Sequence, residues 1–275
     1  MASHRQRNDR NDAARGPRRG PAQAPEHAAS AGHRRRLEEV RSEWLWGWHT
    51  VLAALENPLR SQPKRLLATP ERAALLKARH GASLAIEAAD SQAIARIVPA
   101  GASHQGVALR IPLIEPASLD DLAGEARGFL IMLDQVTDPM NVGAIFRSAA
   151  AFGARGVILQ DRHAPALAGA LAKAAAGAID KIPHAREINL SRALERLEAL
   201  GWRAVGLDAA APGSLAEVLD GAPTVLVMGA EGEGMRRLVR EHCDAVARIP
   251  LPGGFESLNV AAAAAVAMYE LSRRD

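Results

Sequence analysis

The sequence predicts an α/β protein in which helices cover both faces of a parallel sheet and a smaller α/β domain precedes that sheet. The first observation is a series of short apolar runs from residue 128 onward, since strands buried on both faces are continuously apolar. The second is that helical patterns lie between these runs, as they do in β-α-β units. Strands are expected at residues 129–133, 157–159, 182–188, 204–207, 224–228 and 246–249, and helices at 142–152, 166–176, 190–200, 235–241 and 257–271.

The composition fits one large or two modest folded domains. The 275 residues are 48% hydrophobic but only 3% aromatic, so Ala, Leu, Val and Ile must build the core. The single cysteine, Cys243, excludes an intramolecular disulfide and a cysteine-based metal cluster. No apolar run reaches the length of a membrane span, and the N-terminus lacks the apolar core of a secretory signal. We therefore expect a cytoplasmic protein that needs neither a membrane nor a metal.

The N-terminal segment 1–40 is predicted to be a disordered, arginine-rich arm. Its first 36 residues contain nine arginines, no lysine and three acidic residues, while the rest of the chain is slightly acidic. The segment is rich in Gly, Pro, Ala, His and Asn and cannot bury enough apolar surface to fold. Such an arm suits polyanions, through phosphate contacts and the release of counterions. The alternative is a solubilising tail without a partner.

Residues 41–113 are predicted to form the smaller α/β domain. Trp44, Trp46 and Trp48 alternate, which would place all three on one side of a strand. Thr69 and Pro70 are typical of a helix start, with a capping hydroxyl followed by proline at the first helical position. Helices are expected at 50–55, after residue 70 and at 91–97, and strands at 65–68, 83–87 and 106–111.

Two irregular segments are expected around the end of this domain. His104, Gln105 and Gly106 make a polar turn before the strand 106–111, and this turn is either a simple connection or a contact loop for RNA. Residues 114–127 are rich in acidic residues and contain Pro116 and Gly124, so we expect a linker with one short helix.

Ligands of parallel sheets bind beyond the carboxyl ends of the strands, and three loops there carry polar residues. The first loop follows the strand 129–133. Asp138 and Pro139 interrupt the regular structure after this strand, and Asn141 can cap the next helix. Arg147 lies six residues later, inside that helix, where its guanidinium can reach a phosphate as a bidentate fork. The alternative for Arg147 is an ordinary salt bridge on the helix surface.

The second loop, residues 229–235, follows the strand 224–228 and is rich in glycine. It is neither the dinucleotide fingerprint nor a phosphate-binding P-loop, because it lacks the G-x-G-x-x-G spacing and the Lys-Ser/Thr pair. The carboxylates of Glu231 and Glu233 would repel a phosphate, and they suit a ligand with hydroxyl groups or a positive charge. The alternative is a flexible turn that caps the next helix.

The third loop, residues 251–259, precedes the last helix. Pro252 and the pair Gly253 and Gly254 exclude helix there, so Ser257 or Asn259 lies near the helix N-terminus. Free backbone N–H groups and the positive end of the helix dipole can hold a polar or anionic group at this position. The loop is therefore predicted to bind a ligand at the start of the last helix. The alternative is an ordinary capped helix without a ligand.

Taken together, the three loops resemble the signature motifs of the SpoU (TrmH-like) family. The matching motifs are Asn141-x-Gly143-x-x-x-Arg147, the run from Met228 to Gly234 that contains Glu231, and the stretch from Ile249 that ends in Ser257-Leu-Asn259-Val. Members are S-adenosylmethionine-dependent RNA ribose 2′-O-methyltransferases with a trefoil-knotted (SPOUT) parallel sheet. The resemblance places the catalytic domain at residues 128–275, after a linker at 114–127.

The smaller domain resembles the L30e-like RNA substrate-binding domain of one branch of this family. The spacing Gly47-x-His49-x-Val51 fits the branch that methylates a guanosine of the large-subunit (23S) ribosomal RNA. The resemblance thus implies 23S ribosomal RNA or its precursor as the partner, and a homodimer. A transfer-RNA 2′-O-methyltransferase and a non-catalytic RNA-binding ribosome-assembly factor are the alternatives.

The resemblance also implies the roles of individual residues. Backbone groups of Gly229, Ile249 and Leu258 would hold S-adenosylmethionine. Arg147 would contact the phosphate or ribose at the target nucleotide, and Asn141, Glu231 and Asn259 would orient Arg147 and the ribose, with Ser257 as a further candidate. The chain departs from many relatives over 254–256, where Phe255 and Glu256 stand in place of small polar residues.

Overall fold

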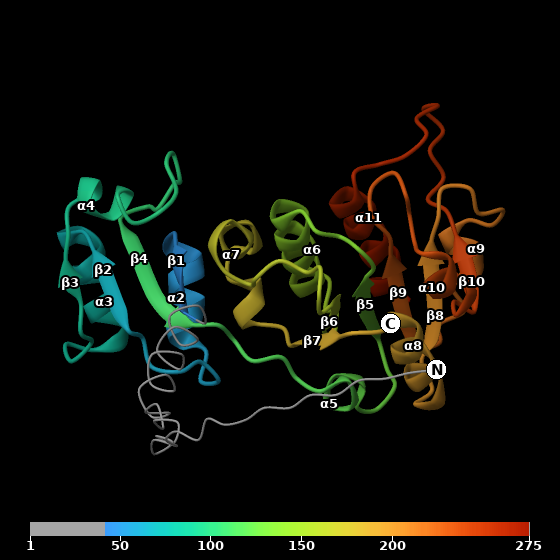
Figure 1. Ribbon diagram of the computed structural model, residues 1–275, viewed down its shortest axis with the longest axis horizontal. Helices are drawn as coiled ribbons and strands as arrows, with labels where there is room; N and C mark the ends of the chain where they lie inside the picture. The colour runs from blue at the N-terminus through green and yellow to red at the C-terminus, as the bar shows by residue number, and fades with distance from the viewer. Residues whose placement is uncertain (1–41, 275) are drawn as a thin grey trace, which may run out of the picture. The chain divides into compact units, whose positions relative to one another are not determined.

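The computed structural model describes residues 42–274, and two sheets organise this part of the chain (Figure 1). The first sheet contains the strands β1 (Ser42–Trp46), β2 (Arg65–Ala68), β3 (Glu87–Ala88) and β4 (Val107–Pro112). The second contains β5 (Phe129–Leu133), β6 (Val157–Gln160), β7 (His184–Glu187), β8 (Arg203–Leu207), β9 (Thr224–Met228) and β10 (Ala245–Ala247). The arginine-rich arm predicted for 1–40 lies outside the described residues.

The first sheet has the strand order β1-β4-β2-β3 and is covered by helices on both faces. Its pairs are antiparallel except for β2 and β3, which run parallel. Leu66 and Ala68 of β2 belong to the same apolar cluster as Leu76 of α3, whereas Leu67 belongs to a cluster with Ile94 of α4. The helices of this region are α2 (Trp48–Glu56), α3 (Pro70–His80) and α4 (Ser91–Ala95).

Two details of this domain correct the sequence predictions. Trp48 is the first residue of α2 and not part of a strand, because Gly47 adopts a φ of 90° that ends β1. Trp44 and Trp46 do share one strand face and pack in one cluster. The strand expected at 83–87 is reduced to Glu87–Ala88, because the Leu84 N–H donates to the Gly81 carbonyl and the chain turns there.

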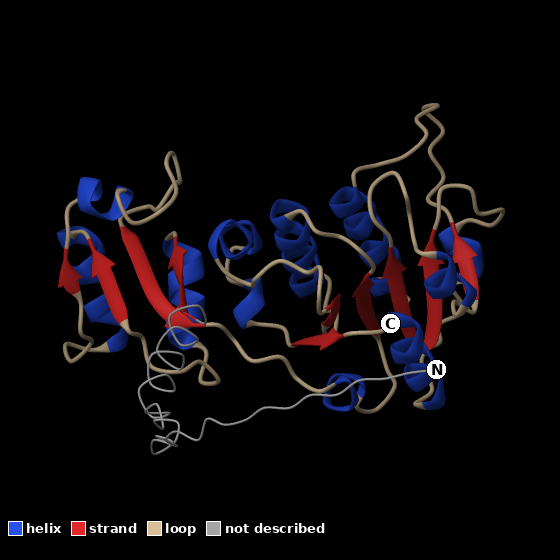
Figure 2. Ribbon diagram, in the orientation of Figure 1, coloured by secondary structure: helices blue, strands red, loops and turns tan. Residues whose placement is uncertain are grey.

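The second sheet is parallel throughout, as predicted, and has the strand order β10-β8-β9-β5-β6-β7. Side chains of β5 alternate between two cores: Ile131 and Leu133 face one cluster, and Leu130 and Met132 face the other. Figure 2 shows the helices on both faces. They are α5 (Leu119–Ala123), α6 (Pro139–Ala151), α7 (Gly169–Ala175), α8 (Leu190–Ala199), α9 (Leu215–Val218), α10 (Arg237–Glu241) and α11 (Val260–Ser272), with a 3-10 turn at Ala178–Asp180.

Most differences from the predicted elements are shifts of their ends. The short helix α5 in the linker is confirmed, and the Ser118 hydroxyl caps it by accepting from the Asp121 N–H at 3.1 Å. The helix α9 was not predicted, although Ser214 and Glu217 form a complete capping box at its start. The last helix begins at Val260 and not at residue 257, because Asn259 is its N-cap.

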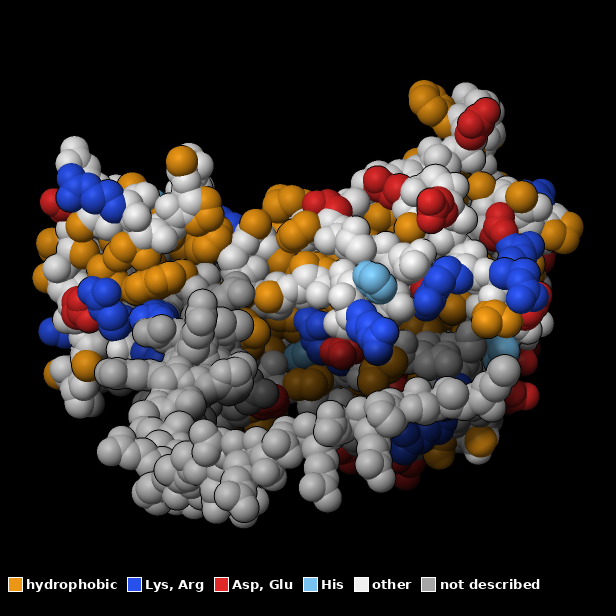
Figure 3. Space-filling model, viewed as in Figure 1, with side chains coloured by type: hydrophobic (Ala, Val, Ile, Leu, Met, Phe, Trp, Pro, Cys, Tyr) orange, Lys and Arg blue, Asp and Glu red, His pale blue; other side chains and the backbone are white. Residues whose placement is uncertain are grey.

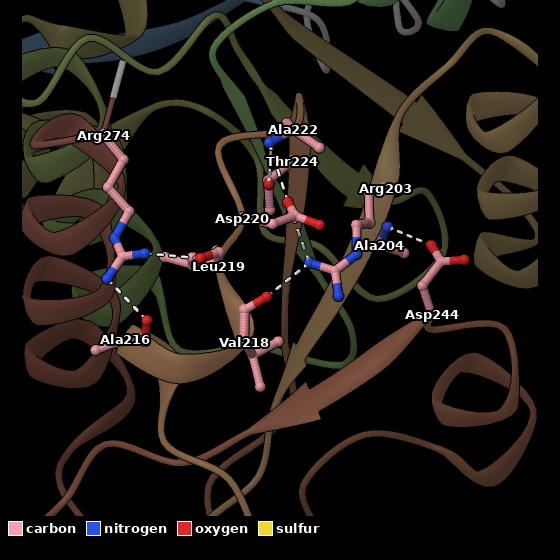
Figure 4. A network of polar contacts seen from close by, with 10 residues as sticks. All are labelled: Arg203, Ala204, Ala216, Val218, Leu219, Asp220, Ala222, Thr224, Asp244 and Arg274. Atoms are coloured by element: carbon pink, nitrogen blue, oxygen red, sulfur yellow. Dashed lines mark hydrogen bonds and ion pairs between the residues drawn. The ribbon is translucent and has the colours of Figure 1, made fainter.

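The chain end is fastened to α9 by a network of polar contacts (Figure 4). Arg274 donates from Nη1 to the Leu219 carbonyl at 2.6 Å and from Nη2 to the Ala216 carbonyl at 2.8 Å. Arg203 of β8 donates to the Val218 carbonyl at 2.9 Å. These bonds satisfy carbonyl groups that the end of a helix leaves without partners, so they fix α9 between β8 and the end of α11.

A buried ion pair joins the two sheet domains. The Nε of Arg60 lies 2.7 Å from Oδ1 of Asp180, and each side chain is only 2% exposed. Arg60 also donates to the Pro112 carbonyl at 2.9 Å, and Asn57 donates to the same Asp180 oxygen at 3.1 Å. The Thr50 hydroxyl adds a bond to the Ala172 carbonyl. None of the helices within residues 42–274 combines the length and apolarity that a membrane crossing requires.

Candidate functional site

The carboxyl ends of β5, β9 and β10 lie on the same side of the parallel sheet. A buried aspartate there connects the loop after β5 to the loop after β9. Asp134, at the end of β5, is fully buried. Its Oδ2 accepts from the Arg236 N–H at 2.8 Å, and its Oδ1 accepts from Arg236 Nε at 2.8 Å. Sequence reasoning missed Asp134. The available signal was an acidic residue directly after an apolar run, because a buried carboxylate requires a partner.

The glycine-rich loop after β9 is a closed turn. The N–H of Ala230 donates to the Gly234 carbonyl at 3.1 Å, and the N–H of Gly234 donates back to the Ala230 carbonyl at 3.0 Å. A side chain at Gly229 is excluded, because a Cβ there would lie 2.1 Å from the carbonyl carbon of Gly234. The two bonds hold Glu231 and Glu233 at the exposed tip of the turn.

Asn259 closes the third loop by capping α11. Its Oδ1 accepts from the N–H groups of Ala261 at 3.0 Å and Ala262 at 3.3 Å. The cap leaves the Nδ2 group of Asn259 available as a donor to the other loops. Ser257 lies before the cap, is exposed, and makes no hydrogen bond to any described residue. Of the two candidates for the helix start, the structure therefore selects Asn259.

One carboxylate oxygen of Glu231 accepts hydrogen bonds from residues of the other two loops. Its Oε1 accepts from Asn259 Nδ2 at 2.6 Å, from Asn141 Nδ2 at 3.2 Å and from the Val260 N–H at 3.3 Å. The triangle is closed by Asn259 Nδ2, which also donates to Asn141 Oδ1 at 3.0 Å. Three of the predicted site residues thus meet, although they lie on three separate loops.

The prediction that Asn141 caps α6 was wrong. Asp138 is the cap, and its Oδ2 accepts from the Asn141 N–H at 3.0 Å, with Pro139 at the first helical position. Asp138 directly precedes that proline, so it occupies the position where a side chain can reach the free N–H groups. Asn141 lies inside the first turn, and its side chain is therefore free to reach Glu231.

Arg147 lies on the exposed surface of α6, outside the triangle. Six residues after Asn141, it points about 120° away around a helix of 3.6 residues per turn. Its side chain makes no hydrogen bond or ion pair to any residue between 42 and 274, so the alternative of a helix salt bridge is not observed in that part of the chain. Gly143 of the same motif packs against α7, where a Cβ would lie 2.5 Å from the Leu171 carbonyl oxygen.

The three residues carried over as cofactor ligands lie on the second and third loops. Gly229 and Ile249 are half-buried, and Leu258 is 38% exposed. Phe255 on the same loop is 80% exposed. Figure 3 shows acidic side chains gathered above the upper ends of these strands and above α11, whereas most Lys and Arg side chains on that face lie lower. This edge of the sheet therefore offers apolar side chains, backbone groups and negative charge.

Comparison with models of known protein families shows to which family this chain belongs. Residues 128–269 match the model of the SpoU rRNA Methylase family, and residues 44–117 match that of the RNA 2'-O ribose methyltransferase substrate binding family. The chain belongs to the SpoU family. The matched range contains the three loops whose motifs resemble this family, and these loops are in contact through Asn141, Glu231 and Asn259.

Curated relatives of this SpoU chain are named as tRNA/rRNA methyltransferases. An uncharacterized one from Mycolicibacterium vanbaalenii is 42% identical over 182 residues, which cover 64% of this chain and 58% of the relative. A putative TrmH family member from Bacillus subtilis is 43% identical over 176 residues, which cover 62% of this chain and 71% of the relative. The chain thus spans just over half the length of the mycobacterial relative.

Solved structures share the fold over most of the chain. The AdoMet-bound rRNA methyltransferase from Sinorhizobium meliloti has a TM-score of 0.72 and 27% identity, covering 87% of this chain and 90% of that one. A putative RNA methyltransferase of the TrmH family from Porphyromonas gingivalis has a TM-score of 0.70 and 27% identity, covering 88% and 93%. Both structures are named as RNA methyltransferases.

Proposed function

We propose that this SpoU protein transfers a methyl group from S-adenosylmethionine to a ribose 2′-hydroxyl of RNA. The observation that carries the proposal is the triangle of Asn141, Glu231 and Asn259, which joins all three signature loops at the carboxyl edge of the sheet. Arg147 projects from the same helix as Asn141. Membership of the family, and the cofactor named for the Sinorhizobium meliloti structure, support the choice of chemistry.

The residues at this edge fit S-adenosylmethionine. The ligand combines an adenine ring, ribose hydroxyls and a sulfonium cation. Leu258 supplies an accessible apolar side chain, the backbones of Gly229 and Ile249 supply hydrogen-bonding groups, and the tip carboxylates favour a positive charge. When bound, the cofactor supplies an electrophilic methyl carbon.

Arg147 is assigned to the RNA. Its guanidinium stays charged at every relevant pH and offers a fork of donors that matches phosphate geometry. Placed against the phosphate or ribose of the target nucleotide, it fixes the hydroxyl and stabilises the negative charge that develops on the oxygen. Because its side chain has no partner among the described residues, no bond within residues 42–274 must break before RNA binds.

The triangle is assigned to positioning. Glu231 fixes the Asn141 amide at the start of α6 and the Asn259 amide at the start of α11. Since Asn141 lies in the first turn of α6 and Asn259 caps α11, the carboxylate sets how the RNA-facing and cofactor-facing loops are aligned. Ser257 is exposed beside this cluster and remains a further candidate for contact with the ribose.

The substrate we favour is a guanosine of 23S ribosomal RNA or its precursor. The support is the match of residues 44–117 to a substrate-binding family, in a domain that we assign to the L30e-like class. A transfer RNA is the second candidate, because the names of the relatives include both classes of RNA. A non-catalytic ribosome-assembly factor is the third, and it predicts that calorimetry detects no cofactor binding.

We further propose a cytoplasmic homodimer with a trefoil knot around α11. The accessible apolar side chains of Phe255, Leu258, Val266 and Tyr269 on this helix and the loop before it support an interface there.

The test measures incorporation of labelled methyl groups from S-adenosylmethionine into unmodified ribosomal RNA. The wild-type chain should methylate the RNA, and Arg147→Ala should abolish transfer while cofactor binding stays within about twofold. Arg192→Ala is the matched control, because Arg192 is also exposed and its side chain makes no bond to the described residues. Methylation at the wild-type rate by Arg147→Ala would reject the assignment.

A further inference from the structure

A cavity of about 600 Å³ opens at the β7 edge of the parallel sheet, at the end of the strand order opposite to β10. Its volume lies within the range of sites that enclose small ligands. One wall is the linker after β4, another is the segment after β6, and the floor includes two residues of β7. The lining residues are Lys64, Pro112, Leu113, Ile114, Glu115, Pro116, Ala164, Ala166, Leu167, His184 and Arg186.

A fixed guanidinium makes this cavity suitable for an anion. Arg186 donates from Nη2 to the Pro165 carbonyl at 2.9 Å and more weakly from Nη1 to the Asp161 carbonyl at 3.4 Å. Burial lowers the pKa of Arg186, and the carboxylate of Asp161 partly opposes this shift. Lys64 is a second cation in the lining, and the only acidic lining residue among those described, Glu115, is exposed.

The second observation is a buried imidazole without a hydrogen bond. His184 is 2% exposed and lines the cavity; its ring packs edge-on against that of Phe146, with 6.5 Å between the ring centroids, and makes no hydrogen bond to any residue between 42 and 274. Burial, together with the charges of Arg186 and Arg60, lowers the pKa of His184 to about 4, so the ring is neutral at pH 7. A neutral imidazole has one donor and one acceptor nitrogen. A ligand in the cavity could therefore both donate to this ring and accept from it.

The apolar part of the lining suits an apolar group of a ligand, such as the face of a ring. Leu113, Ile114, Ala164 and Leu167 surround the same space as the two cations. A ligand that satisfies the whole lining therefore needs an apolar face, polar edges for His184 and an anionic group for Arg186.

We propose that this cavity binds a nucleoside phosphate, with the base against the apolar wall and the phosphate near Arg186. The nucleotide is either free or one residue of an RNA chain, and the second source rests on the proposed function in RNA methylation. The site differs from the three signature loops in its position, because it lies at the edge strand β7, and β6 separates β7 from β5, which the first of those loops follows.

Binding of GMP, AMP and UMP to the full chain, measured by calorimetry, tests the proposal. Arg186→Gln should weaken binding at least tenfold, and Ala166→Phe, which adds a bulky apolar side chain at a lining residue, should do the same. Arg192→Gln and Ala199→Phe are matched controls at exposed positions and should bind like the wild type. Because Arg186 also supports the segment after β6, the Ala166 variant keeps the test valid if Arg186→Gln disturbs the fold.

A competing single-stranded RNA oligonucleotide separates the two sources. Displacement of the mononucleotide by the oligonucleotide supports a nucleotide of RNA as the occupant, and binding without displacement supports a free nucleotide. Absence of mononucleotide binding at millimolar concentration, or wild-type affinity in both cavity variants, overturns the proposal. If Arg147→Ala still binds the mononucleotide but no longer transfers methyl groups, the cavity and the methyl-transfer site function independently, and the two proposals are tested separately.

Discussion

Replacing Asn259 by Asp separates the two functions of this side chain, which caps α11 and also bridges the signature loops. A carboxylate at 259 still accepts from the N–H groups of Ala261 and Ala262, since Asp and Asn are about equally good caps. It cannot donate, so both bonds from Nδ2, to Glu231 and to Asn141, are lost. The change therefore removes the bridge and leaves the helix start intact.

The cost follows from the contacts that are lost and from the new repulsion. Two hydrogen bonds contribute about 0.5–1.5 kcal/mol each. The carboxylate of Asp at 259 would also face Glu231 across the contact that now measures 2.6 Å. Because both groups are exposed, this repulsion is of the order of 1 kcal/mol and not the several kcal/mol of a buried pair. We expect Asn259→Asp to lower the free energy of unfolding by about 2–4 kcal/mol, and Asn259→Ser, which keeps only the cap, by about 1–3 kcal/mol.

Urea unfolding of these variants, with Glu231→Gln and the double variant, measures the bridge directly. Glu231→Gln removes one of the two facing charges, so Asn259→Asp should cost about 1 kcal/mol less in that background. Calorimetry should show weaker S-adenosylmethionine binding by Asn259→Asp than by Asn259→Ser. Wild-type stability of Asn259→Asp, or additive effects in the double variant, would refute the view that the loops are joined through this amide.

Three further predictions concern the scaffold. Asp180→Ala leaves Arg60 buried without its partner and should cost about 3–5 kcal/mol in urea unfolding; a loss below 1 kcal/mol would show that the ion pair does not hold the domains. Gly143→Ala places a Cβ 2.5 Å from the Leu171 carbonyl oxygen and should cost about 1–3 kcal/mol, and an unchanged midpoint would contradict this close packing of α6 on α7. His184 has its pKa lowered to about 4, so the unfolded chain binds more protons between pH 6.5 and 4, and stability falls by about 3 kcal/mol as the pH falls through this window. His184→Leu should flatten that part of the pH profile, and an equally steep profile would exclude His184 as its source.

The sequence predicted the architecture because burial leaves a strong pattern. The continuous apolar run of β5 requires cover on both faces, and the two cores on either side of that strand confirm it. Ends of elements were less accurate, because several polar residues compete for each cap. At α6, Asp138 and Asn141 are both capping types, and the proline between them decides in favour of Asp138. Trp48 illustrates the same limit, since only the positive φ of Gly47 ends the strand before it.

The site was predictable in its position but not in its contacts. The three loops follow from the ends of parallel strands, and the residues that meet there were named from their motifs. The bonds themselves join Glu231 to Asn141 and Asn259 across long stretches of chain, and no local pattern encodes them. Asp134 was missed for the same reason, because its partner Arg236 lies on another loop.

The most direct test of the central claim maps ribose 2′-O-methylation across total RNA from cells with and without this protein. The account predicts that one ribose methylation, at a guanosine of large-subunit ribosomal RNA, disappears without the protein. It should return with the wild-type chain and not with Arg147→Ala. An unchanged map, loss of a base methylation instead, or full restoration by Arg147→Ala would contradict it.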